Sequence, residues 1–513
     1  MGFEYRTLVE LLRARAESQA DKNAYTFLFD GETEETSLSY GELDRRARAI
    51  GARLQSLSAK DQPVLLLYPP GLEYIAAFFG CLYARAIAVP VYPPTSQRSL
   101  PRLWSIVKDA RPRVALTTTP ILSKLEQTSG SAKLPALQWL TTDNLDISIA
   151  TQWRSEPLLR ESPAFIQYTS GSTATPKGVM LTHDNLLQNQ RMIQLAFEQT
   201  EHSVILGWLP LYHDMGLIGN VLQSMYCGAR CILMSPLSFL QRPARWLQAI
   251  SRYEATTSGG PNFAYDLCVR KIGPQERAEL DLRSWTVAFN GAEPVREDTI
   301  DRFCATFEPC GFRREAFFPC YGLAESTLFV SGGPKSASPV ITKVRRAALE
   351  TNAVVTADGA DENVTSFVGS GCTWLDQKTR IVDPSSLHEC PSGLIGEIWV
   401  AGPHVAQGYW ERPEESEATF RAYIADTREG PYLRTGDLGF MRAGELFVTG
   451  RLKDLIIIRG RNYFPHDIEL TVERSHESLR PGGGAAISID WHSEEHLVVV
   501  HEVDRHTIQT FRT

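Results

Sequence analysis

Residues 168–178 read Tyr168-Thr169-Ser170-Gly171-Ser172-Thr173-Ala174-Thr175-Pro176-Lys177-Gly178. Hydroxyl groups and free backbone N–H groups can surround phosphate oxygens, glycines allow close approach of the backbone, and Lys177 adds a positive charge. The order differs from the P-loop pattern G-x-x-x-x-G-K-[ST], because here glycine follows the lysine and proline precedes it. A plain surface loop has a similar composition, so other segments must decide between that interpretation and a phosphate-binding loop.

The flanks of this loop predict a strand, a turn and a helix. Residues 164–168 are a short apolar run, and residues 179–186 lead into a helical pattern with Thr182 and Asp184 near its start. Other short apolar runs alternate with helical spacing at residues 64–67, 86–91, 114–116, 204–209, 231–234 and 286–289. This alternation predicts α/β layers, in which active residues lie just beyond the ends of strands.

The chain of 513 residues has room for two or three domains. Short β segments between Gly/Pro turns predict a β subdomain over about 369–450, and the composition of about 338–366 suggests an insertion or a variable surface loop. The sequence pattern changes at residues 450–454, after which an apolar run at 455–458 begins, and this change predicts a hinge. We therefore expect a protein of the α/β class. A large N-terminal domain (1–450) would contain two α/β layered subdomains and the β subdomain. Residues 451–513 would be the start of a small, incomplete C-terminal α+β domain.

Composition excludes several classes of protein. The net charge is −8, the pI is about 5.9 and the basic residues are dispersed, so we expect no nucleic-acid partner. Nine cysteines without a C-x-x-C pair favour reduced thiols and argue against a structural metal. The N-terminus lacks the layout of a signal peptide, and the apolar stretch 74–92 is interrupted by Arg85 and Pro90. These features predict a cytoplasmic chain without a membrane span.

Further segments place polar residues in turns after apolar runs. His213 and Asp214 lie in the turn 211–217, where such a pair is more often structural than functional. The Asn-Gly-Ala-Glu-Pro segment at 290–294 could hold a base or merely cap a helix.

Two carboxylates, Glu325 and Asp437, also lie in turns that follow apolar runs. Glu325, in the segment 320–326, could bind Mg²⁺ beside nucleotide phosphates or could be an ordinary acid at a helix start. Asp437, in the glycine turn 433–439, could accept hydrogen bonds from a ribose diol or form an Asx-turn. Residues 450–454 add fixed cations at the predicted hinge.

Taken in this order, these segments resemble the core motifs of the adenylate-forming (acyl-activating, AMP-binding) enzyme superfamily, and the resemblance covers essentially the whole chain. Within it, the chain is most similar to fatty acyl-AMP ligases, through residues 208–210, 213–217, 289–294, 319–325 and 458–462. Those ligases carry an insertion where residues 338–366 lie. In that subfamily the insertion hinders the rotated state that thioester formation with coenzyme A requires, so it excludes one acceptor.

The resemblance implies a reaction, cofactors and partners. A medium- or long-chain fatty acid would react with ATP and Mg²⁺ to give acyl-adenylate and pyrophosphate. The acyl group would then pass to the phosphopantetheine thiol of an acyl carrier protein, or of a carrier domain in a polyketide or peptide synthase. Because two anions must meet, electrostatic stabilisation should dominate the rate.

The resemblance also implies roles for individual residues. The β- and γ-phosphates would be held by Thr169, Ser170, Gly171, Ser172, Thr173 and Lys177. The adenine side would be formed by Asn290, Gly291, Ala292, Glu293, Tyr321 and Gly322. Glu325 would bind Mg²⁺, Asp437 the ribose hydroxyls, and Arg451 ribose or phosphate, while Lys453 would sit at the hinge. His213 would stand at the mouth of the acyl pocket, which Phe263 could line.

One family feature is missing. Members carry a lysine near the C-terminus that reaches the carboxylate and the α-phosphate, but no lysine follows Lys453 here. An incomplete C-terminal domain is the simpler explanation, and an enzyme that truly lacked this lysine would adenylate slowly. Two alternatives to an acyl-AMP ligase therefore stay open: a fatty acyl-CoA synthetase, and a non-catalytic module that binds ATP and acyl chains.

Overall fold

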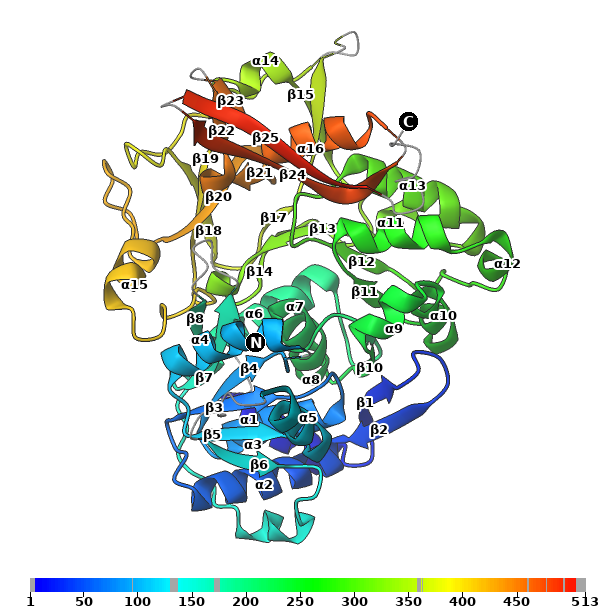
Figure 1. Ribbon diagram of the computed structural model, residues 1–513, viewed down its shortest axis with the longest axis vertical. Helices are drawn as coiled ribbons and strands as arrows, with labels where there is room; N and C mark the ends of the chain where they lie inside the picture. The colour runs from blue at the N-terminus through cyan, green and yellow to red at the C-terminus, as the bar shows by residue number, and fades with distance from the viewer. Residues whose placement is uncertain are drawn as a thin grey trace.

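The computed structural model describes residues 5–94, 96–129, 137–169, 176–357, 361, 363–458, 461–476, 478–491 and 494–503. Two large sheets form the body of the molecule, and the elements from the end of the chain lie at the top of Figure 1. No helix in these ranges is long and apolar enough to cross a lipid bilayer.

A six-stranded sheet carries the predicted phosphate segment. Its order is β6 (Gln138–Thr141), β5 (Val114–Thr117), β3 (Pro63–Leu67), β4 (Ile87–Val91), β7 (Pro163–Thr169) and β8 (Lys177–Thr182). All neighbours are parallel except β7 and β8, which form an antiparallel pair.

The pair β7–β8 corrects the expected strand, turn and helix. Residues 177–182 form a second strand, and the helix α6 (His183–Phe197) begins only after it, with Thr182 as its N-cap. The alternating apolar residues of β8 pack on its partner strand, with Val179 opposite Gln167 and Leu181 opposite Phe165. Pairing along the hairpin therefore overrides the helical spacing on which the prediction was based.

A nine-stranded mixed sheet forms the second layer. Its order is β17 (Cys372–Thr373), β14 (Phe329–Gly332), β13 (Phe317–Gly322), β12 (Val287–Asn290), β11 (Thr257–Gly259), β9 (Val204–Gly207), β10 (Arg230–Met234), β1 (Asn23–Leu28) and β2 (Glu35–Ser39). The strands from β13 to β1 are parallel, so their carboxyl ends share one edge. The turns after β12 and β13, which carry predicted site residues, therefore lie next to each other.

Helices cover both sheets. They are α1 (Leu8–Ser18), α2 (Tyr40–Ser56), α3 (Leu72–Tyr83), α4 (Leu100–Ala110), α5 (Thr119–Ser129), α6, α7 (Asp214–Gly216), α8 (Gln223–Cys227), α9 (Pro236–Gln241), α10 (Ala244–Tyr253), α11 (Asn262–Lys271), α12 (Pro274–Arg277) and α13 (Glu297–Phe307). A π-helical segment, Leu217–Leu222, joins α7 to α8.

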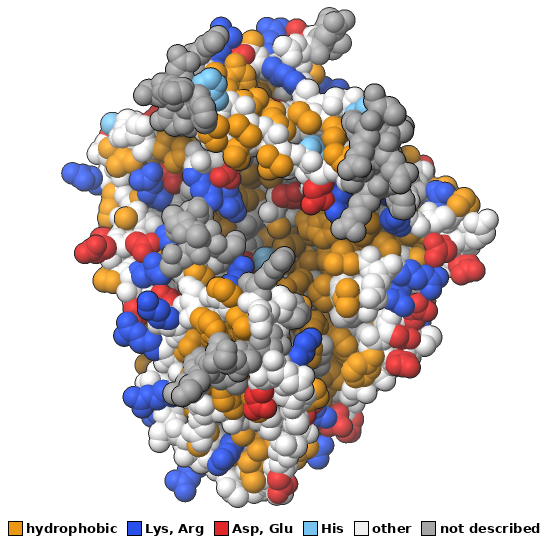
Figure 2. Space-filling view, in the orientation of Figure 1, with side chains coloured by type: hydrophobic (Ala, Val, Ile, Leu, Met, Phe, Trp, Pro, Cys, Tyr) orange, Lys and Arg blue, Asp and Glu red, His pale blue; other side chains and the backbone are white. Residues whose placement is uncertain are grey.

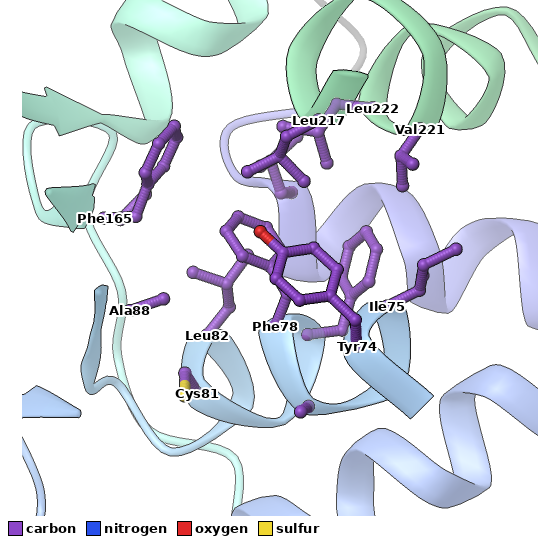
Figure 3. Close-up of a cluster of buried hydrophobic side chains, with 14 of the residues drawn as sticks. Tyr74, Ile75, Phe78, Cys81, Leu82, Ala88, Phe165, Leu217, Val221 and Leu222 are labelled. Carbon is purple, nitrogen blue, oxygen red and sulfur yellow. The ribbon is translucent and has the colours of Figure 1, made fainter. Parts of the chain in front are cut away.

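The core between the two halves is centred on α3. Every residue of this helix except Glu73 is buried, which explains why its sequence is apolar on all sides. Figure 3 shows Phe78 and Tyr74 of α3 facing Leu217 and Leu222 of the π-helical segment. The two α/β halves therefore share one continuous core.

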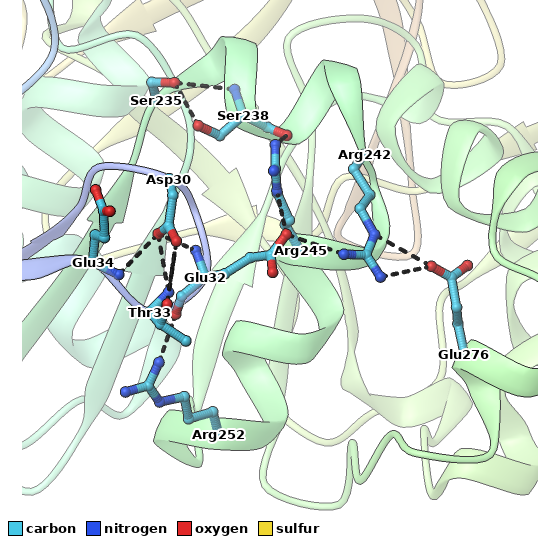
Figure 4. A network of polar contacts seen from close by, with 10 residues as sticks. All are labelled: Asp30, Glu32, Thr33, Glu34, Ser235, Ser238, Arg242, Arg245, Arg252 and Glu276. Atoms are coloured by element: carbon cyan, nitrogen blue, oxygen red, sulfur yellow. Dashed lines mark hydrogen bonds and ion pairs between the residues drawn. The ribbon is translucent and has the colours of Figure 1, made fainter.

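Polar contacts fix the turn between β1 and β2. Figure 4 shows Glu32 between Arg242 and Arg245, with its Oε1 3.0 Å from Arg242 Nη1 and 2.9 Å from Arg245 Nε. Asp30 accepts backbone hydrogen bonds from Glu32 and Glu34 in the same turn. Hydrogen bonds from Arg245 lower the pKa of Glu32, so this carboxylate stays charged at neutral pH. The network attaches the hairpin to α10.

The later part of the chain is built of smaller β units. An antiparallel sheet contains β18 (Lys378–Val382), β19 (Gly396–Ala401), β20 (Leu433–Arg442) and β21 (Glu445–Arg451), with α15 (Pro413–Phe420) between β19 and β20. Residues after the predicted hinge form β22 (Ile456–Ile458), β23 (Arg461–Tyr463), α16 (Pro465–Glu473), β24 (Leu479–Trp491) and β25 (Glu494–Val503).

The predicted insertion is a β-hairpin. Its strands β15 (Ile341–Arg345) and β16 (Val364–Val368) are antiparallel, and the short helix α14 (Arg346–Leu349) follows β15. The hairpin reaches the segment after the hinge, because Arg461 Nη1 lies 3.2 Å from Glu350 Oε2 and Asn462 Nδ2 donates to Asn352 Oδ1 at 3.1 Å.

Candidate active site

A cavity of about 840 Å³ lies where both sheets, the β subdomain and the hinge meet. Its polar lining includes Thr169, Lys177, His213, Glu325, Asp437, Arg451 and Lys453; its apolar lining includes Ile193, Phe197, Met215, Phe289, Leu328, Phe329 and Val368. In Figure 2 the molecule is hollowed in the middle of this face, and hydrophobic side chains gather along one wall of the hollow. Polar and apolar chemistry therefore meet in one space.

The phosphate segment frames one side of the cavity. Thr169 ends β7 and pairs in register with Lys177, which begins β8. Lys177 Nζ lies 2.5 Å from Glu415 Oε2 and 4.9 Å from the ring centre of Tyr409. The predicted phosphate ligands Ser170, Gly171, Ser172 and Thr173 lie outside the described residues.

A chain of polar contacts holds this hairpin against α4 and α15. Tyr168 Oη donates to Asp109 Oδ2 at 2.6 Å, and Asp109 Oδ1 accepts from Arg412 Nη2 at 2.9 Å. Arg412 Nη1 in turn donates to Glu415 Oε1 at 3.0 Å. Burial is the main cause that raises the pKa of Tyr168, so its phenol remains a neutral donor. Lys177 is thus anchored through its partner Glu415 to three separate elements.

Glu325 lies on a short 3₁₀ turn between β13 and β14. Its Oε1 accepts from Tyr409 Oη at 3.0 Å, and its backbone oxygen accepts from Ala406 N at 2.9 Å. Burial raises the pKa of Glu325, and the neighbouring Asp437 and Asp214 raise it further. A cation at this carboxylate would relieve that repulsion.

These surroundings fit Mg²⁺. Within the described ranges there is no cluster of three or more ligating side chains. A single carboxylate is the donor set expected for an ion that takes most of its ligands from nucleotide phosphates and water. Glu325 could therefore hold Mg²⁺ together with a nucleotide.

Asp437 is held between two donors. Tyr321 Oη donates to its Oδ2 at 2.7 Å, and Arg451 Nε lies 3.5 Å from its Oδ1 across the β20–β21 ladder. Burial raises the pKa of Asp437, while Tyr321 and Arg451 lower it. The structure thus brings together three residues that the family resemblance assigned to the nucleotide.

Glu397 accepts hydrogen bonds from the turn that precedes Asp437. Its side chain is only 2% exposed and accepts from Arg434 Nε at 3.0 Å, Gly436 N at 3.1 Å and Trp399 Nε1 at 2.9 Å. The turn before Asp437, with Gly436 at φ +72, is therefore fixed by a buried acid. Sequence reasoning missed Glu397, although an acid inside the apolar strand 396–401 was a usable signal.

The predicted adenine side is largely backbone. A side chain at Gly322 would place Cβ 1.7 Å from the oxygen of Leu328, and one at Gly291 would place it 2.7 Å from the oxygen of Cys320. Ala292, which also lines the cavity, has φ +69, a conformation uncommon for a residue other than glycine. Glu293 and Tyr321 line the same cavity.

Two predicted residues are placed elsewhere. Asn290 is fully buried and does not line the cavity; its Nδ2 donates to Asn262 Oδ1 at 3.1 Å. Phe263 is 44% exposed on α11, packs edge-on against Trp208, and is likewise absent from the cavity wall. The resemblance assigned Asn290 to the adenine side, but its side chain packs between β12 and α11 instead.

His213 is the N-cap of α7 and lines the cavity. Its Nδ1 lies 2.5 Å from Asp214 Oδ1, and the charge of Asp214 is the main cause that raises the pKa of His213. The imidazole therefore carries its proton to higher pH than a free histidine. Arg451 and Lys453 line the cavity from the hinge side and are 60% and 42% exposed.

The AMP-binding enzyme family matches residues 12–410 of the chain. The medium-chain fatty acid [acyl-carrier-protein] ligase JamA of Moorena producens is 48% identical over 98% of this chain and 86% of its own length. A ligase with the same description, TtuA of Teredinibacter turnerae, is 38% identical over 97% of this chain and 84% of its own.

A fatty acyl-adenylate ligase of Legionella pneumophila, solved with acyl adenylate and pyrophosphate, has the same fold. It is 42% identical, with a TM-score of 0.86, over 99% of this chain and 89% of the solved one. The chain therefore belongs to the AMP-binding, adenylate-forming enzyme family. The predictions of a fatty acyl-AMP ligase and of its α/β fold class are confirmed.

Proposed function

We propose that the chain activates a medium- or long-chain fatty acid with ATP and Mg²⁺, and then transfers the acyl group to a carrier-protein thiol. One observation carries the proposal: Lys177, Glu325 and Asp437 line the same cavity as the apolar wall around Phe197 and Leu328. Such a cavity can hold a nucleotide and an acyl chain together. Two relatives are described as ligases that join a medium-chain fatty acid to an acyl carrier protein, which supports the same reaction here.

The first half-reaction joins two anions. A fatty-acid carboxylate oxygen forms a bond to the α-phosphorus of ATP, and the bond from that phosphorus to the bridging oxygen breaks, so pyrophosphate leaves with the electron pair. Lys177 would neutralise phosphate charge and Asp437 would accept from the ribose diol, which fixes the reacting phosphorus. Mg²⁺, held at Glu325, would supply further charge neutralisation.

The second half-reaction consumes the adenylate. The thiol sulfur forms a bond to the acyl carbon, its proton passes to water, and the acyl–oxygen bond breaks so that AMP leaves with the electron pair. Enclosure of the mixed anhydride by the apolar wall would protect it from water until the acceptor arrives. The acceptor would be an acyl carrier protein or a carrier domain of a polyketide or peptide synthase.

The proposal also assigns different roles to the two predicted domains. Residues 1–450 would bind both substrates, and residues from 451 onward would move about Lys453 between the half-reactions. A cytoplasmic location, where ATP is supplied and thiols stay reduced, agrees with nine cysteines that are all free.

A product assay tests the proposal. The protein is incubated with mixed fatty acids, ATP and either coenzyme A or a phosphopantetheinylated carrier protein, and the products are identified by mass spectrometry. We expect acyl-adenylate and acylated carrier protein. Acyl-CoA as the main product would identify an acyl-CoA synthetase instead, and ATP binding without any acyl product would identify a non-catalytic module.

Loosening the insertion should change the acceptor. The hairpin β15–β16 contacts the segment after the hinge through Glu350 and Asn352. Glu350→Ala with Asn352→Ala removes both side-chain contacts, to Arg461 and Asn462, and leaves the backbone hydrogen bond from Asn462 N to the oxygen of Glu350. We expect acyl-CoA formation to rise at least several-fold while adenylate formation is unchanged, because only the second half-reaction needs rotation. Lys343→Ala, at an exposed position on the same hairpin, is the control. Unchanged acyl-CoA in the double variant contradicts this role.

Fatty-acid binding should depend on the charge of His213. Asp214 raises the pKa of His213, so the imidazolium that attracts a carboxylate persists above the usual range and is lost as pH rises through the raised pKa. We expect KM for the fatty acid to increase in the parent as pH rises through the raised pKa of His213. In His213→Gln, KM should not change with pH over the same range. His202→Gln, at a fully exposed histidine, should keep the parent profile. A pH-dependent KM in His213→Gln would exclude this role.

A further inference from the structure

Tyr409 occupies a fixed position between the β subdomain and the phosphate hairpin. Its backbone forms a bridge with Val179 of β8, and Trp410 N donates to the oxygen of Gly178 at 2.7 Å. Tyr409 N donates to Ser416 Oγ at 2.9 Å, and its ring packs edge-on against Phe420 of α15 at 5.1 Å. The side chain is only 6% exposed, so its ring and hydroxyl have one defined orientation.

The hydroxyl of Tyr409 touches one oxygen of Glu325. Oη donates to Glu325 Oε1 at 3.0 Å, which leaves Oε2 for another ligand. Burial raises the pKa of Tyr409, and the nearby Glu325 raises it further, so the phenol keeps its proton. The neutral phenol donates its proton to the carboxylate oxygen and thereby fixes the orientation of the carboxylate.

The ring of Tyr409 touches the other charged residue of the site. Lys177 Nζ lies 4.9 Å from the ring centre, within the range of a cation–π contact, while its charge is paired with Glu415. One side chain therefore contacts both the carboxylate and the ammonium group that line this part of the cavity.

We propose that Tyr409 is a positioning residue of the adenylation site: its hydroxyl orients Glu325 toward Mg²⁺, and its ring supports Lys177 beside the nucleotide phosphates. The inference rests on the proposed function, because it assigns both groups to ATP and its metal. Outer contacts of this kind hold a ligating carboxylate in the orientation that the metal needs, and their loss lowers metal affinity.

Two substitutions separate the hydroxyl from the ring. Tyr409→Phe removes the hydrogen bond to Glu325 and keeps the ring under Lys177, whereas Tyr409→Leu removes both. Tyr74→Phe is the matched control, because the Tyr74 hydroxyl is also buried but has no partner among the described residues. Thermal unfolding of each variant checks that it is folded.

The readout is equilibrium binding to the whole chain. Free Mn²⁺ is measured by electron paramagnetic resonance in the presence of α,β-methylene ATP, and binding of the same nucleotide without metal is measured by calorimetry in EDTA. We expect Tyr409→Phe to weaken Mn²⁺ binding roughly tenfold and to leave metal-free nucleotide binding within about twofold. Tyr409→Leu should weaken both, and Tyr74→Phe neither.

A double-mutant cycle with Glu325→Gln tests the route of the effect. If Tyr409 acts through Glu325, adding Tyr409→Phe to Glu325→Gln causes little further loss of Mn²⁺ affinity. Full additivity, or Mn²⁺ binding by Tyr409→Phe within twofold of the parent, overturns the proposal. Fatty-acid-dependent exchange of pyrophosphate into ATP by the parent is recorded separately. Its absence refutes the proposed function, whereas its presence with unchanged Mn²⁺ binding refutes only the role of Tyr409.

Discussion

Replacement of Lys177 by alanine is expected to lower fatty-acid-dependent exchange of pyrophosphate into ATP by about 10²- to 10³-fold, the usual loss when one group that stabilises developing charge is removed. The reason is electrostatic. Lys177 lies at the start of β8, lines the cavity and stays there through Glu415 and Tyr409, so its charge is already in place when ATP binds. Alanine leaves the phosphates without this cation, while the Glu415 carboxylate keeps Arg412 as its partner.

The control for this prediction is Lys378→Ala. Lys378 is 57% exposed on β18 and forms a comparable ion pair with Glu429 at 2.8 Å, but it does not line the cavity. An ion pair of a mostly exposed lysine contributes little to stability, so Lys378→Ala should fold normally. Lys177 is more buried, so thermal unfolding checks that Lys177→Ala is folded. Exchange by Lys177→Ala within about threefold of the parent would show that Lys177 does not act on the phosphates.

Replacement of Glu325 by glutamine is the second large effect, again of about 10²- to 10³-fold at low Mg²⁺. Glutamine keeps the shape of the side chain and removes the negative charge, so it can still accept the hydrogen bond from Tyr409 but binds a hard cation weakly. Raising the Mg²⁺ concentration should recover part of the activity, because the defect is in metal affinity. A titration of exchange rate against Mg²⁺ measures both effects.

Glu445→Gln provides the matched comparison for Glu325. Glu445 is also partly buried, burial also raises its pKa, and it accepts from Gly371 N at 2.7 Å, but it lies outside the cavity wall. Its substitution should leave the Mg²⁺ dependence unchanged. The same Mg²⁺ curve for Glu325→Gln and the parent would mean that Glu325 is not the metal ligand.

Much of the fold could be predicted from local patterns. The apolar runs at 64–67, 114–116 and 231–234 are strands, as their spacing between helical segments predicted. These elements are buried or clearly periodic, so the local signal and the tertiary structure agree. The strand β8 was mistaken for part of a helix, because its pairing with β7 is a tertiary interaction that periodicity over a few residues does not report.

The candidate site was predictable where a motif carries its own chemistry. Lys177, His213, Glu325 and Asp437 were all chosen from their residue type and turn context, and all line one cavity. Their partners were not predictable in the same way. Tyr409 and Glu325 are 84 positions apart, and Tyr409 carries no chemical signal until the fold places its hydroxyl on that carboxylate. Asn290 shows the converse, since a suggestive residue in a suggestive turn is packed away from the cavity.

The backbone wall at Gly291 and Gly322 has a consequence for engineering. Neither position has room for a Cβ, so no amino-acid substitution can reshape that surface without displacing the main chain. The apolar wall is different, because Ile193, Phe197 and Met215 present side chains to the cavity. On the proposed assignment of the apolar wall to the acid and of Gly291 and Gly322 to adenine, directed evolution would reach new acids by changing side chains, whereas a change of nucleotide would require a new loop.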